Sequence, residues 1–244
     1  MINQNSLSRY KQILSIIEEN INHIRNPYLT REAELDFDSS TNSWIIYYKN
    51  TQSEFPIIHE LGHIYFAIKK TSYMHFALPP PPNPVLNRII GNLTNNLLDC
   101  FVNYSLSTFD EIFPIIQQND FNFLNSIDNF QRNIKGINDL PTLLGWYFLF
   151  YLDFKFILKE EDRDIRNQDI DSFLGILKYQ IYTFTDFNQN NIEKLTDNLN
   201  RFDGVKNEIH ALRIIHFIFS ILLDINLWSE EELRKQIKLF FPPP

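Results

Sequence analysis

The pentapeptide His59-Glu60-Leu61-Gly62-His63 constrains this chain more than any other feature. Two histidines four residues apart lie on the same face of an α-helix, about one turn from each other. Both imidazoles can therefore reach a single zinc ion at roughly 2.0–2.1 Å. The carboxylate of Glu60 then lies beside the metal, where it can polarise a bound water molecule. The spacing thus predicts a metal-binding helix.

The residues around the pentapeptide support a helix. Apolar residues flank it on both sides: Ile57, Ile58, Ile64, Phe66, Ala67 and Ile68. Ser53 is a plausible N-cap, and Pro56 is tolerated in the first turn. Gly62 in the helix interior costs about 1 kcal/mol relative to alanine. This cost indicates the close approach of another backbone or a ligand, or a packing reason.

The pattern resembles the zincin metallopeptidases, in which an HExxH helix follows a hairpin and an edge strand lines the substrate cleft. Two short strands, Glu34–Asp38 and Trp44–Tyr48, are predicted here around the polar turn Ser39–Ser43. The resemblance implies a zincin-like core, one zinc ion per chain and hydrolysis of peptide bonds. We expect the strand Trp44–Tyr48 to hold an extended peptide by main-chain hydrogen bonds.

A catalytic zinc ion normally has three protein ligands and an open position for water. A third histidine six residues after the second is excluded, because position 69 is Lys69. The first acid after Glu60 is Asp99, in the stretch Leu86–Tyr104, which is predicted to be helical. Asn95, Asp99 and Asn103 form a polar stripe on this otherwise apolar helix. Such groups are costly to bury without partners, and a metal ion with hydrogen-bonded neighbours would supply them.

The segment Asn95–Asn103 also resembles putative prokaryotic metallopeptidase domains, often joined to von Willebrand A-like domains, in which N-x-x-x-D-x-x-x-N follows HExxH. The match covers about residues 53–104, and the connection here is longer, with prolines at 79–82 and 84. The resemblance implies that Asp99 is the third zinc ligand. We expect Asn103, one turn further, to orient a ligand histidine.

Three alternatives for the third ligand stay open. His75 follows the predicted active-site helix and could reach the metal from a loop. Asn95 together with Asp99 would imitate a Glu-x-x-x-Asp pair, although a neutral amide is a poorer zinc ligand than a carboxylate. In the third alternative, the Asn/Asp stripe is only the solvated face of an amphipathic helix.

Composition excludes several other functions. The net charge is −8, which disfavours a nucleic-acid partner. The chain has 6 glycines and neither a P-loop nor a G-x-G-x-x-G motif, which argues against a glycine-rich phosphate site. Cys100 is the single cysteine, so no intramolecular disulfide is possible, and we expect a buried core thiol.

The longest apolar runs, Leu143–Leu152 and Ile214–Leu223, are about half as long as a bilayer span. Met1–Ser6 lacks the basic and apolar regions of a secretion signal. We therefore expect a cytoplasmic protein without a membrane partner.

The predicted fold class is α+β and predominantly α-helical. Residues 1–105 are expected to form the zincin-like core with a small β-hairpin or sheet, and residues 106–244 a helical lobe packed on it. Lys159–Asp171 is charge-dense and is expected to be an exposed connection. Besides the helices already named, further helices are expected at Leu7–Ile24, Phe109–Gln118, Pro141–Leu158, Ile170–Thr183, Ile192–Arg201, Val205–Leu223 and Ser229–Leu239.

The sequence therefore predicts a zinc-dependent metallopeptidase, with His59, His63 and Asp99 as ligands and Glu60 as general base. A zinc hydrolase of another amide is an alternative. A helical interaction protein with a structural or vestigial metal site is another, although a vestigial site does not need Glu60. His210, His216 and Tyr104 are candidates for stabilising an oxyanion, but for each an ordinary structural role is the better interpretation.

Overall fold

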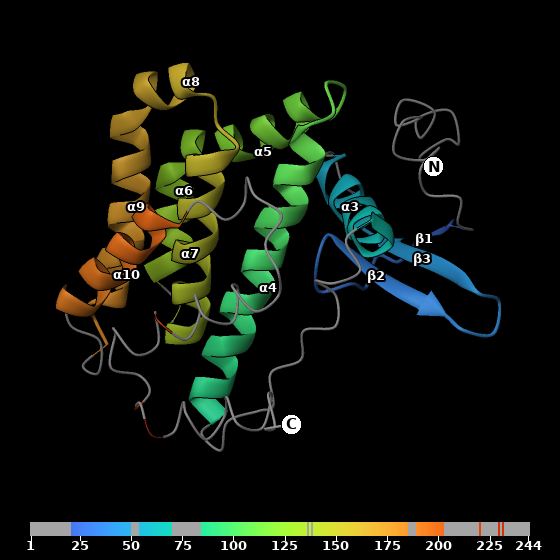
Figure 1. Ribbon diagram of the computed structural model, residues 1–244, viewed down its shortest axis with the longest axis horizontal. Coiled ribbons are helices and arrows are strands. Elements are labelled where there is room, and N and C mark those ends of the chain that lie inside the picture. Colours follow the sequence, from blue (N-terminus) through green and yellow to red (C-terminus); the bar gives the residue numbers. More distant parts are fainter. Residues whose placement is uncertain are drawn as a thin grey trace, which may run out of the picture. The chain divides into compact units, whose positions relative to one another are not determined.

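The computed structural model describes residues 21–49, 54–69, 84–135, 137, 139–184 and 189–202, with positions 220, 229 and 231. The described part is predominantly helical with one small sheet, so the predicted α+β class is confirmed (Figure 1). His75, His210, His216, the proline-rich segment before Pro84 and the helices predicted beyond residue 204 lie outside the described residues, apart from those isolated positions.

The chain divides into two compact units, and the division differs from the predicted boundary at residue 105. The first unit consists of residues up to Met74 and Val102–Asn119. The second consists of His75–Phe101 and everything from Asp120 onward. Helix α4 (Pro84–Ser107) is continuous across the boundary at Phe101 and Val102.

The first unit contains a three-stranded mixed sheet in the order β1-β3-β2 (Figure 1). β1 (Ile21–Arg25) runs parallel to β3 (Ser43–Tyr48), and β2 (Ala33–Asp38) runs antiparallel to it. The predicted strands are confirmed, each with one additional residue at its start. Ala33 and Ile46 are buried, and helix α3 (Phe55–Lys69) packs on both β2 and β3.

The hairpin between β2 and β3 is closed by side chains of the polar turn. One carboxylate oxygen of Asp38 accepts hydrogen bonds from the Ser40 amide and hydroxyl, at 2.9 and 2.6 Å, and the other accepts one from Thr41 at 2.8 Å. Asn42 has a φ of 50°, the left-handed region that asparagine tolerates better than most residues. The hydrogen bonds from Ser40 and Thr41 lower the pKa of the Asp38 carboxyl to about 2.

Two expectations about the strands are wrong. The predicted helix Leu7–Ile24 does not extend to its end, because Ile21–Arg25 is strand β1, whose backbone is satisfied by parallel pairing with β3. β3 is the middle strand, so its main chain is bonded on both sides and cannot pair with a peptide as we expected for Trp44–Tyr48. The edges of the sheet are β1 and β2.

The second unit is built around α7 (Leu140–Phe156), which contacts α9 (Asn167–Ile181) and α10 (Gln189–Arg201). Aromatic rings fill its centre. The ring centroids of Phe150 and Phe173 lie 4.9 Å apart in a T-shaped arrangement. Helices α7, α9 and α10 are the three helices predicted at Pro141–Leu158, Ile170–Thr183 and Ile192–Arg201, and each is confirmed with slightly different bounds. The helix predicted at Phe109–Gln118 is α5 (Phe113–Asn125), and α6 (Ile127–Lys135) was not predicted.

The expected exposed connection at Lys159–Asp171 is wrong in part. It contains α8 (Glu160–Ile165) and the beginning of α9. Three acidic residues, Glu160, Glu161 and Asp162, occupy the first turn of α8, where a negative charge interacts favourably with the helix dipole. Within the described residues, none of the helices combines the length and the apolar character that crossing a bilayer requires.

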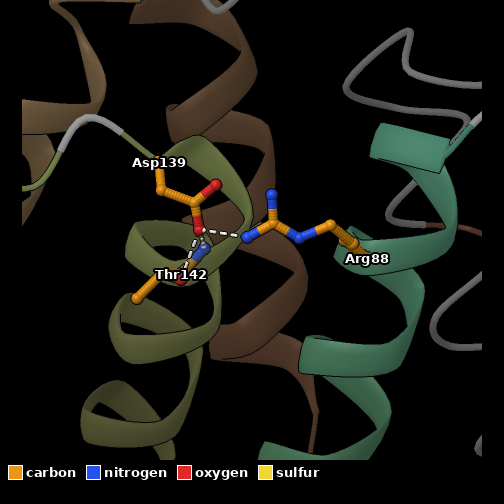
Figure 2. A network of polar contacts seen from close by, with 3 residues as sticks. All are labelled: Arg88, Asp139 and Thr142. Atoms are coloured by element: carbon orange, nitrogen blue, oxygen red, sulfur yellow. Dashed lines mark hydrogen bonds and ion pairs between the residues drawn. The ribbon is translucent and has the colours of Figure 1, made fainter.

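Helix α4 is joined to α7 by a polar network within the second unit (Figure 2). Asp139 is the N-cap of α7 and accepts hydrogen bonds from the amide and the hydroxyl of Thr142. Arg88 of α4 binds the same carboxylate oxygen at 2.7 Å. Burial by itself raises the pKa of Asp139, but Thr142 and the Arg88 guanidinium lower it more, so the pKa lies below its usual value.

Candidate metal centre

The HExxH sequence lies on α3 with its apolar side buried. Pro56 occupies the first turn, as expected. Ile57, Ile58, Leu61 and Ile64 are at most 3% exposed, whereas His59, Glu60 and His63 are half-buried. The burial of one face leaves the three polar side chains where a ligand can reach them.

The two histidines point ring nitrogens at the same place. Their Nε2 atoms lie 3.1 Å apart, and the rings are perpendicular. Nδ1 of His59 lies 2.8 Å from Oδ1 of Asn103, which belongs to the same compact unit. Because an amide oxygen only accepts, Nδ1 of His59 carries the proton, and the lone pair of the neutral ring is on Nε2. Asn103 thereby selects the tautomer in which Nε2 is available to a metal ion.

Asp99 lies one helical turn before Asn103 on the continuous helix α4. His59, His63 and Asp99 each offer one ligand atom, and these atoms all lie within 4.8 Å of one another, so the three residues form a group that could bind a metal ion. The polar stripe of α4 changes character along its length, since Asn95 is exposed, Asp99 is half-buried and Asn103 is 4% exposed. The solvated-face interpretation therefore applies at Asn95 and does not extend to Asn103.

The donor atoms fit zinc. Two bonds of about 2.05 Å at a tetrahedral angle place their nitrogens about 3.3 Å apart, and the observed separation is 3.1 Å. Two imidazole nitrogens and one carboxylate oxygen are also the donor types of a catalytic zinc site, with the fourth position left for water or substrate. Soft thiolate ligands do not contribute, because the only cysteine, Cys100, lies within the core.

Gly62 explains how closely α3 approaches α4. A Cβ atom at this position would lie 2.5 Å from Cδ1 of Leu106 and 2.6 Å from Cγ1 of Val102, both of which are fully buried. The glycine in the middle of HExxH is thus a packing requirement of the α3–α4 contact. The same contact brings His59 to Asn103.

Cys100 confirms the expected buried thiol. Burial raises its pKa well above the ordinary value, and the carboxylate of Asp153, which also accepts the thiol's hydrogen bond, raises it further together with Asp120 and Asp99. The thiol therefore stays protonated. Asp120 and Asp153 are themselves at most 3% exposed. Neither acid was predicted to be important from the sequence, although Asp153, which directly follows the apolar run Leu143–Leu152, was the available signal.

Phe55 was also not predicted to lie at the site; its ring centroid is 5.6 Å from that of His59. Tyr104, a candidate for oxyanion stabilisation, is half-buried. In comparisons with known proteins, the chain matches no family model, no curated protein and no solved structure.

Proposed function

We propose that this protein is a zinc-dependent metallopeptidase. The observation that carries the proposal is the grouping of His59, His63 and Asp99, with Glu60 on the same helix as the two histidines. The hydrogen bond that Nδ1 of His59 donates to Oδ1 of Asn103 supports it, because oriented ligands are typical of a functional metal site.

In this proposal, His59, His63 and Asp99 would hold one zinc ion through ring nitrogens and a carboxylate oxygen. Zinc in such a site supplies Lewis acidity, which makes water a nucleophile near neutral pH and polarises the scissile carbonyl. Glu60 accepts the proton of the attacking water and delivers it to the leaving amine. Asn103 keeps the ring of His59 oriented throughout.

Two rival functions use the same residues differently. A zinc hydrolase of another amide would use the same proton transfer by Glu60 on a different substrate. A non-catalytic interaction protein would need only a structural ion, which usually has four protein ligands. Among the described residues, three possible ligands lie together, and Glu60 is not one of them. These two points favour an enzyme.

The test compares Glu60→Gln with Glu111→Gln. Glu111 is an exposed acid of the same unit outside α3, so its substitution makes the same change in charge without touching the HExxH helix. Each protein is reconstituted with zinc and incubated with a mixture of diverse peptides, and cleavage is followed by mass spectrometry. Glu60→Gln should retain one zinc but lose at least about a hundredfold in cleavage rate, whereas Glu111→Gln should match the wild type.

Cleavage by Glu60→Gln at the wild-type rate would show that the general base is assigned wrongly. A zinc-loaded wild type that cleaves none of the peptides would refute the peptidase proposal. The predicted cytoplasmic location and the expected lack of a nucleic-acid partner stay predictions from the sequence.

A further inference from the structure

We propose that strand β2 binds an extended peptide in which basic and apolar side chains alternate. The inference deepens the proposed function, on which it rests for the role of this peptide as a substrate. All residues that carry it lie in the first unit, which also contains α3 and its two histidines.

The hydrogen-bonding pattern shows which backbone groups of β2 face outward. The amide of Lys49 donates to the carbonyl of Glu32 at 2.9 Å, so this opposed pair is a hydrogen-bonded one. In an antiparallel ladder such pairs alternate. The main-chain groups of Glu34 and Asp36 therefore face β3, and those of Ala33, Leu35 and Phe37 face away from it.

Two further hydrogen bonds agree with this assignment. Tyr48, opposite Ala33, uses its carbonyl on the β1 side, where it accepts from the Asn26 amide at 2.9 Å. The outward amide of Phe37 donates to the carboxylate of its neighbour Asp36 at 2.8 Å. Among the described residues, none pairs with the outward groups of Ala33 and Leu35. An extended peptide can therefore add to this edge as a fourth strand.

The side chains of β2 determine which peptide fits. Residues two apart in a strand point to the same face, so Glu34, Asp36 and Asp38 form an acidic row. Their partners across β3 are Tyr47, Ile45 and Ser43, all neutral. Within the described part of the chain, no ion pair joins the three carboxylates to a lysine or arginine. The charges of the row are therefore available to a ligand.

The opposite face of β2 is apolar. It presents Leu35 and Phe37, and Phe37 is 42% exposed although its ring centroid lies 4.9 Å from that of Trp44. A peptide strand added beside β2 places its own alternate side chains on these two faces. Lysine or arginine on one face and apolar residues on the other would match the acidic row and the Leu35–Phe37 side together.

The alternative explanation is that the acidic row only protects the edge. Charged side chains on an edge strand prevent pairing with other molecules. The two explanations differ in their consequence, since protection predicts self-association when the charges are removed, and recognition predicts weaker binding of a basic peptide.

The test measures binding by fluorescence anisotropy with zinc-loaded Glu60→Gln protein, in which the peptide stays intact. The probes are a labelled octapeptide of alternating lysine and valine, its glutamate–valine counterpart, and a block peptide of four lysines and four valines. The second protein carries Glu34→Gln and Asp36→Asn in addition. The amide oxygen introduced at position 36 can still accept the hydrogen bond from the main-chain amide of Phe37. The control adds Asp110→Asn and Glu111→Gln, two exposed acids of the same unit outside the sheet.

We expect the alternating lysine peptide to bind at least about tenfold more tightly than the other two, with an affinity that falls as salt rises. Removal of Glu34 and Asp36 charges should weaken it about three- to tenfold, and the control should not. Equal binding of the block peptide, or unchanged binding by the double variant, overturns the proposal. A double variant that self-associates while still binding the alternating peptide as before supports edge protection instead.

The outcome is separable from that of the proposed function. If the alternating peptide binds as expected but the wild type cleaves no peptide, the docking edge stands and the peptidase proposal fails. If the wild type cleaves peptides without regard to their charge, the peptidase stands and the inference about β2 fails.

Discussion

Gly62→Ala tests the packing that brings α3 to α4. Alanine is favoured over glycine in a helix interior by about 1 kcal/mol. At Gly62 the added methyl group would meet buried atoms of Leu106 and Val102 at 2.5–2.6 Å, and overpacking of this kind costs about 1–3 kcal/mol. The net change should be a loss of up to about 2 kcal/mol in the free energy of unfolding. Because the helices must move apart, the His59–Asn103 hydrogen bond should lengthen and zinc affinity should fall about 10–100-fold.

Gly91→Ala is the matched control, since Gly91 is an exposed glycine inside α4 and its added methyl group would meet no atom within 4 Å. This variant should be more stable than the wild type by about 0.4–1 kcal/mol, with unchanged zinc affinity. Urea unfolding and competition with a zinc chelator measure both quantities. If Gly62→Ala is as stable as Gly91→Ala and binds zinc as the wild type does, the packing argument is refuted.

Two further predictions concern polar contacts. Asn103→Ala should weaken zinc binding about 10–100-fold in chelator competition. Asn103→Asp keeps an acceptor for Nδ1 of His59 and should therefore retain most of the affinity. Equal losses of affinity in both variants would contradict the orienting role of Asn103. Asp139→Ala should lower the free energy of unfolding by about 1 kcal/mol through loss of the α7 cap, and Arg88→Ala by less than about 0.5 kcal/mol, because the Arg88 side chain is 60% exposed. Since the pKa of Asp139 is lowered by folding, its contribution is complete above the unfolded pKa of about 3.9 and should disappear as the pH falls through the lower, folded value; a difference between wild type and Asp139→Ala that does not shrink in acid would contradict this.

The parts of the site that depend on one helix were predictable from the sequence. The i, i+4 spacing of His59 and His63 fixes their common face, and the same spacing places Asp99 and Asn103 on one face of α4. Within each pair, the helical spacing alone determines that the two side chains lie on the same face. The helices themselves followed from the placement of apolar residues. In α9 they recur with the helical period, whereas α7 contains a continuous apolar run long enough for a buried helix.

Features that depend on partners distant in sequence were not predictable. Ile21–Arg25 is a strand only because β3 offers it a parallel neighbour, and no local pattern reports this pairing. The middle position of β3 likewise follows from tertiary structure, and it excluded the peptide contact expected there. Gly62 signalled a close approach, but its partners Val102 and Leu106 became known only from the packing of α3 on α4.

The central claim is that His59, His63 and Asp99 share one zinc ion. Crystals of zinc-reconstituted protein, with anomalous maps recorded on both sides of the zinc absorption edge, test it most directly. The account predicts one zinc peak per chain, at roughly 2.0–2.2 Å from Nε2 of each histidine and from a carboxylate oxygen of Asp99, with a non-protein ligand in the fourth position. A peak that lacks Asp99 would refute the third ligand, and the absence of any zinc peak beside His59 and His63 would contradict the account as a whole.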